Sequence, residues 1–176
     1  VAMGIFVLLA GSLSSIFTQA LQGQRKTLAT QEVLEQTSYV LDYMSRALRM
    51  AKKDITGSCT GIGPNYVTYI TTNSRVLGGQ TFSGPGIKFI NSSSVCQEFF
   101  LDSASSTLKE SQSGAAPVDL ISKNIKINSF NIYFVGTHQN DTIQPKVTFF
   151  LDIEGKNQSK IKVQTTVSQR NLDIKR

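Results

Sequence analysis

Residues 1–54 contain no proline and keep a helical pattern throughout, which constrains the fold more than any other feature of the chain. Residues 1–10 carry nothing more polar than glycine, and the first charged residue is Arg25. Apolar side chains then recur at helical spacing, with Leu34, Leu41 and Leu48 seven residues apart. We therefore expect one continuous helix of about 50 residues, which at 1.5 Å per residue would be about 75 Å long.

The expected helix has two halves of different character. Residues 1–21 form an apolar half suited to a membrane or a filament core, and residues 22–54 form an amphipathic half with most charged residues off the apolar stripe. A helix with one apolar stripe fits packing on a sheet, so we expect Leu41→Asp to unfold the domain that follows. The side chains expected to anchor this half on the sheet are Leu34, Leu41, Met44 and Leu48.

A second interpretation makes the apolar residues the end of a cleavable secretory signal. The strictly apolar run is about ten residues, which is shorter than the roughly 20 that span a bilayer as a helix. An initiator methionine and a basic segment are missing, and residues 20–23 lack the small-x-small spacing of a cleavage site. We favour the continuous helix, with the chain beginning inside a longer hydrophobic segment.

Residues 55–176 have the pattern of an antiparallel β-sheet head domain. Apolar and polar residues alternate in several segments, which is typical of strands with one buried and one wet face. Gly61–Pro64 and Gly78–Gly86 have the composition of turns or loops. A long helix followed by strands predicts an α+β fold, with the helix packed on an antiparallel β-sheet. The expected strands are Tyr66–Thr71, Gly86–Ile90, Val95–Leu101, Thr107–Glu110, Ile125–Val135, Lys146–Ile153 and Lys160–Val167.

The residue counts argue against an enzyme or a metal protein. With two cysteines and one histidine among 176 residues, Cys-rich zinc modules and multi-histidine centres are excluded. No nucleophile elbow, phosphate loop or H-E-x-x-H motif is present. His138 fits a polar hairpin tip better than a general base or metal ligand. Asn140 and Asp141 offer fewer oxygens than calcium needs. We expect no catalytic residue, no cofactor and no metal.

The two cysteines, Cys59 and Cys96, lie on either side of the first expected strands. Outside the cytoplasm a disulfide between them would stabilise the fold by roughly 3–4 kcal/mol in the chain-entropy model. The alternative is a pair of unrelated buried thiols. Because an apolar segment leads into this domain, we favour the disulfide.

The positive charge is modest and dispersed. The chain has 18 Lys and Arg against 12 Asp and Glu, a net charge of +6. A cluster near the C-terminal end could contact phosphates or anionic lipid, but a solvated face is the simpler account. Nucleic acid is therefore not the partner that we favour. The cluster consists of Lys156, Lys160, Lys162, Lys175 and Arg176.

These features together resemble the type IV pilin-like superfamily. In that family a prepilin peptidase cuts just before a Phe-Thr-Leu-x-Glu-Leu stretch, and the residues that follow it resemble VAMGIFVLL at the start of this chain. The cleavage site and its acidic residue would then lie before Val1, outside this sequence. The remainder resembles the minor pseudopilin J and PilW-like branch. The segments that carry this likeness are RALRMAKK at 46–53, CQEFFL at 96–101, STLK at 106–109, PVDLISKNIKINSFN at 117–131, QPKVTFFL at 144–151 and VQTTVSQR at 163–170.

The resemblance implies a structural subunit of a type IV pilus, type II secretion or competence filament. Such a subunit sits in the inner membrane with an extracytoplasmic head before assembly, and N-terminal methylation accompanies its processing. Its partners would be other pilin or pseudopilin subunits, the membrane and the prepilin peptidase. A membrane-anchored adhesin or DNA-capturing pilin is the alternative. The residues expected to pack in the membrane and the filament are Val1, Ile5, Phe6, Val7, Leu8, Leu9, Leu13, Ile16 and Phe17.

Overall fold

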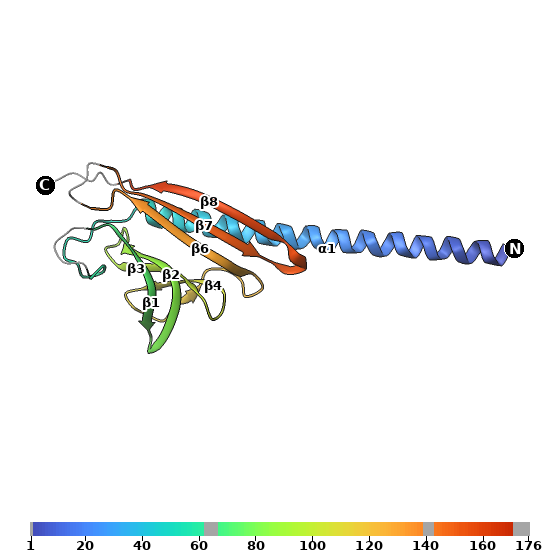
Figure 1. Cartoon of the computed structure of the whole chain (residues 1–176), viewed down its shortest axis with the longest axis horizontal. Coiled ribbons are helices and arrows are strands. Elements are labelled where there is room, and N and C mark those ends of the chain that lie inside the picture. Colours follow the sequence, from blue (N-terminus) through green and yellow to red (C-terminus); the bar gives the residue numbers. More distant parts are fainter. Residues whose placement is uncertain (1, 62–66, 139–142, 171–176) are drawn as a thin grey trace.

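One unbroken helix, α1, spans Ala2–Arg49 and leads into a β-rich head. The computed structural model describes the backbone of residues 2–61, 67–138 and 143–170, and side chains in these ranges from Ser14 onward except that of Gln158. The helix runs through Gly23 without a break, and Figure 1 shows its N-terminal part projecting beyond the strands as an isolated rod. The fold is α+β, as expected from the helix period followed by alternating segments.

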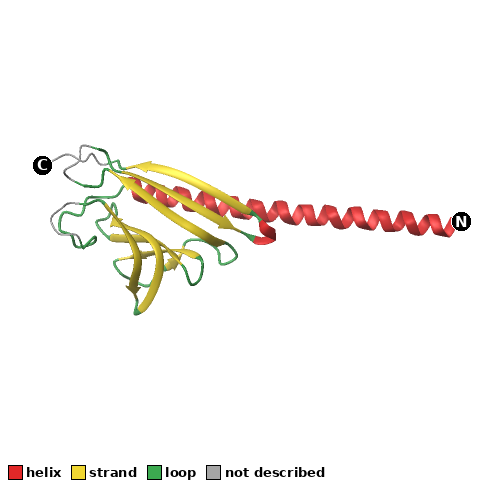
Figure 2. Cartoon of the chain, in the orientation of Figure 1, coloured by secondary structure: helices red, strands yellow, loops and turns green. Residues whose placement is uncertain are grey.

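The described strands form two antiparallel sheets rather than the single sheet expected from the sequence (Figure 2). The second sheet lies along the C-terminal part of α1 (Figure 1). The strands of the first sheet, in spatial order, are β1 (Tyr69–Leu77), β2 (Gln80–Ile90), β3 (Cys96–Asp102), β4 (Thr107–Gln112) and β5 (Val118–Asp119). Those of the second are β6 (Lys126–Val135), β7 (Lys146–Glu154) and β8 (Lys160–Ser168), with the short 3-10 turn η1 (Lys156–Gln158) before β8.

The loop expected over Gly78–Gly86 is wrong, because only its first two residues form a turn. Gly78 and Gly79 both have positive φ, which suits a two-residue hairpin turn between Leu77 and Gln80. The remaining residues belong to β2, which the glycine and proline content of this stretch concealed. Gly84 serves close packing there, since a Cβ at this position would collide with the carbonyl of Leu101.

The helix ends earlier than expected, at Arg49 instead of Asp54. After the end of α1 the chain joins the strands directly, with Lys52 bridged to Ile90 and Asp54 bridged to Val67. The amides of Met50 and Ala51 still donate to helix carbonyls, whereas those of Lys52 and Asp54 donate to Ile90 and Val67 of the head.

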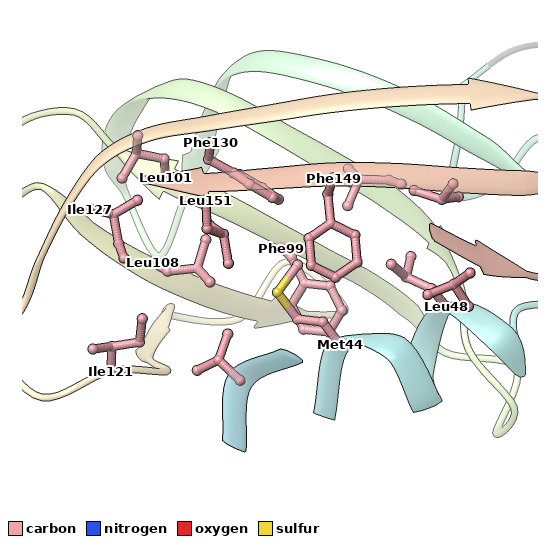
Figure 3. Packing of buried hydrophobic residues seen from close by; sticks show 14 of the residues in the cluster. Met44, Leu48, Phe99, Leu101, Leu108, Ile121, Ile127, Phe130, Phe149 and Leu151 are labelled. Carbon is pink, nitrogen blue, oxygen red and sulfur yellow. The ribbon is translucent and has the colours of Figure 1, made fainter. Parts of the chain in front are cut away.

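The hydrophobic core lies between α1 and the two sheets (Figure 3). Met44 and Leu48 of α1 are fully buried and lie among side chains of both sheets. Phe99 comes from the first sheet, and Phe149 comes from the second. One core therefore holds the helix and both sheets together.

Candidate functional site: the long helix and its seat on the head

The buried stripe of α1, here called the seat, fixes the helix on the head. Its members follow one another at steps of four and three residues, the spacing that keeps side chains on one face of a straight helix. The single polar member, Thr37, donates its hydroxyl to the carbonyl of Val33 at 2.6 Å, so it is satisfied within the helix. The seat consists of Ala29, Val33, Thr37, Val40, Met44, Leu48 and Ala51, the last just beyond the end of α1, all at most 7% exposed.

The structure places the four expected anchors differently. Met44 and Leu48 belong to the seat, and Leu41 is half-buried against the core. Leu34 is 49% exposed, so the expectation that it anchors the helix is wrong. A seven-residue step drifts by about 20° per repeat on a straight helix, so two steps back from Leu48 leave the buried face. Val33, its neighbour, takes that place.

A polar cluster beside the seat joins α1 to the first sheet. The hydroxyl of Tyr43 donates to Glu110 Oε2 at 2.8 Å. The side-chain amides of Gln97 and Gln112 donate to Glu110 Oε1 at 2.8 and 2.6 Å. Burial and the bond to Glu110 raise the pKa of Tyr43 to about 12, so its hydroxyl stays a donor at neutral pH. No local sequence pattern indicates this cluster, although Glu110 shares the inward side of β4 with Leu108.

The C-terminal end of α1 is closed by donors from the head. Three carbonyls near this end accept hydrogen bonds from elsewhere in the chain. The Tyr69 hydroxyl donates to Leu48 at 2.6 Å, and the Arg170 amide donates to Arg49 at 2.7 Å. The side-chain amide of Gln169 donates to the carbonyl of Ala51 at 2.7 Å. These bonds from β1 and from the residues after β8 fix where the helix stops.

A disulfide and a buried carboxylate hold the loop that follows the helix. Cys59 and Cys96 are disulfide-bonded, as expected, which ties this loop to β3. Asp54 is 1% exposed, and its Oδ2 accepts the amides of Cys59 and Thr60 at 2.9 and 2.8 Å. Burial raises the pKa of Asp54, but the hydrogen bonds from Thr60 and Cys59 outweigh it and lower the pKa below its ordinary value.

The upper part of α1 makes little contact with the head: in the described residues its one hydrogen bond to the head runs from the side-chain amide of Asn157 to the carbonyl of Arg25, at 3.4 Å. Residues 14–28, here called the free segment, are all exposed, whereas the seat begins at Ala29. Ile16 and Phe17 are 65% and 66% exposed, and Leu28 is 64% exposed. These large apolar side chains have no described residue covering them. The other expected packing residues, whose side chains lie outside the described ones, are Val1, Ile5, Phe6, Val7, Leu8, Leu9 and Leu13.

The other candidate features from the sequence are a membrane span, a metal site, His138 and the basic cluster. Over the ranges that the structure describes, no helical segment has the length and hydropathy needed to cross a membrane. The same ranges contain no group of three or more His, Cys, Asp or Glu that could hold a metal. His138 is exposed, and residues 139–142 with Asn140 and Asp141 lie outside the described ones. Lys160 and Lys162 pair with Glu154 and Asp152 at 3.1 and 3.3 Å.

Comparison with known proteins identifies no relative. No family model, no curated protein and no solved structure matches this chain.

Proposed function

We propose that this chain is a minor pilin or pseudopilin subunit of a filament of the type IV pilus, type II secretion or competence kind. The N-terminal helix anchors the subunit in the membrane before assembly and packs against the helices of neighbouring subunits afterwards. Other pilin-like subunits are its partners, and a prepilin peptidase processes it before assembly. The head lies outside the cytoplasm, where its disulfide is stable.

The observation that carries this proposal is the contrast between the two parts of α1. The lower part is seated in the head through a continuous core, while the free segment exposes Ile16, Phe17 and Leu28 to solvent. Full burial of such a side chain is favourable by about 1.5–3 kcal/mol. Lateral packing of free segments would cover these side chains and leave the heads outside.

The charge on the second sheet favours this proposal over DNA capture. Of the basic cluster, Lys160 and Lys162 on β8 pair with carboxylates of β7, and Lys156 lies in η1. Counterion release from DNA requires cations free to meet phosphates. A structural role in a filament needs no such surface.

The test is self-assembly of the full chain after detergent removal, followed by sedimentation velocity and electron microscopy. We expect the natural chain to form elongated particles, and the double variant Ile16→Ser, Phe17→Ser to stay small. The matched control is Tyr133→Ser, Val135→Ser, which removes two apolar side chains of the head that are 64% and 57% exposed. The control should assemble like the natural chain. Equal assembly of both variants, or a monomeric natural chain, would contradict the proposal.

A further inference from the structure

Two unpaired strand edges, those of β1 and β6, border a groove between the sheets. In the described residues each of these strands pairs on one side only. At one end the sheets are joined, because the Thr68 amide donates to the carbonyl of Thr137 at 3.2 Å. Further along, the strands enclose a cavity of about 240 Å³. Its lining includes Thr71 and Asn73 of β1, Pro85 and Gly86 of β2, and Asn131 and Tyr133 of β6.

The inward side of β1 changes from apolar to polar at this groove. Tyr69 pairs with Phe89 and is buried in the core. Thr71, two residues further on the same side, is exposed although it pairs with the buried Ile87. The register of β1 then shifts at Asn73, which sets this residue out of the regular ladder. The β1 wall of the groove therefore carries hydroxyl and amide groups, while Phe130 and Ile132 add apolar surface on the β6 wall.

The groove offers hydrogen-bonding groups but no charge. The side chains of Asn73 and Asn131 are exposed, and among the described residues neither amide has a protein partner. The one guanidinium in contact with this region, that of Arg75, lies against Gly86 and is neutralised by Glu98 at 2.7 Å. An anionic or cationic ligand would find no opposite charge among the lining residues. The chemistry fits an uncharged ligand with many hydroxyl groups.

Tyr133 adds an aromatic surface at the rim of the groove. Its ring is 64% exposed and meets Phe150 edge to face, with 6.4 Å between ring centres. This contact orients the ring while leaving most of it open. Exposed aromatic rings bind the C–H faces of sugars, while amides such as Asn73 and Asn131 bind their hydroxyls. A cavity of about 240 Å³ is below the usual range for drug-sized ligands and suits a single sugar ring.

We propose that this groove binds one neutral sugar unit of a glycan chain. Asn73 and Asn131 donate to and accept from its hydroxyl groups, and Tyr133 packs against its ring. The cavity is open to solvent, which leaves room for the chain to continue. This inference goes beyond the filament proposal and does not depend on it, since no lining residue belongs to α1.

The test is saturation-transfer NMR on the full chain in phosphocholine micelles, which carry no sugar headgroup. The probes are cellotriose, maltotriose and chitotriose, each added in millimolar amounts. We expect at least one of them to bind, and Tyr133→Ala and Asn131→Ala each to weaken this binding at least tenfold. The matched controls are Tyr39→Ala, an aromatic residue 60% exposed on α1, and Gln164→Ala, an exposed amide on β8. Both controls should bind like the natural chain.

Three outcomes would overturn the proposal. The first is the absence of saturation transfer to any of the three probes. The second is unchanged binding in Tyr133→Ala and Asn131→Ala, with both variants shown to be folded by their melting temperatures. The third is equal or stronger binding of trigalacturonate or of a six-residue Thr-Val peptide, because these would assign the groove to an anion or to an added β-strand.

Discussion

Glu110 is a carboxylate on the inward side of β4, and its three hydrogen bonds make that position tolerable. It is 9% exposed and accepts from Tyr43, Gln97 and Gln112. A buried charge without such partners would be strongly destabilising. Tyr43 lies on α1 and Glu110 on the first sheet, so the hydrogen bond between them fixes the rotation of α1 about its axis relative to that sheet.

We expect Tyr43→Phe to lower the free energy of unfolding by about 1–3 kcal/mol, since it removes one hydrogen bond to a charged group. Thermal unfolding followed by circular dichroism measures this as a fall in Tm. The control is Tyr39→Phe, whose hydroxyl bonds to no described residue and whose Tm should not move. An equal Tm for the natural chain and Tyr43→Phe would show that the cluster does not help to hold the helix.

Because of Asp54, we expect the head to become less stable as the pH falls. Its pKa is lowered on folding from the ordinary value of 3.8, so its stabilising effect is present above about pH 4 and is lost as the pH falls through the folded pKa. Denaturant unfolding of the natural chain and Asp54→Asn should therefore differ most near pH 6 and converge toward pH 2. A constant difference across this range would contradict the assignment.

The seat on α1 explains why the helix and the head fold together. Substitution by aspartate along α1 should follow burial and not the seven-residue repeat. We expect Met44→Asp to unfold the head and Leu34→Asp to change the free energy of unfolding by less than about 0.5 kcal/mol. Because Leu41 is only half-buried, Leu41→Asp should destabilise the head by a smaller amount than Met44→Asp, and not unfold it as the sequence pattern suggests. Near-ultraviolet circular dichroism reports loss of head packing. If Leu34→Asp lowered the free energy of unfolding as much as Met44→Asp, the assignment of residues to the seat would be wrong.

The sequence predicts the elements with strong local patterns and misses those set by tertiary contacts. The helix follows from its period and from the absence of proline, and β7 and β8 follow from alternation. The start of β2 was missed because its glycines and Pro85 are typical of loops, although here they allow close packing with β3. The split into two sheets could not be predicted, since alternation does not say which strands pair.

For the candidate site too, the sequence predicts some features and misses others. The disulfide could be predicted because only one pairing of two cysteines exists. The sequence pattern wrongly put Leu34 on the buried face, because a seven-residue repeat and a straight helix differ slightly in period. The groove between β1 and β6 gives no local signal, because its walls lie about 60 residues apart in sequence.

In the whole molecule, the free segment is the surface that we propose packs against other helices. The most direct measurement is cysteine scanning of residues 14–28 in membranes of the producing cells, with oxidative crosslinking to neighbouring chains. We expect the yield of crosslinks between chains to rise and fall with a period of about 3.6 residues, as one face of a packed helix requires. A uniform yield along the segment, or crosslinks only from a control cysteine at Tyr133, would contradict the account.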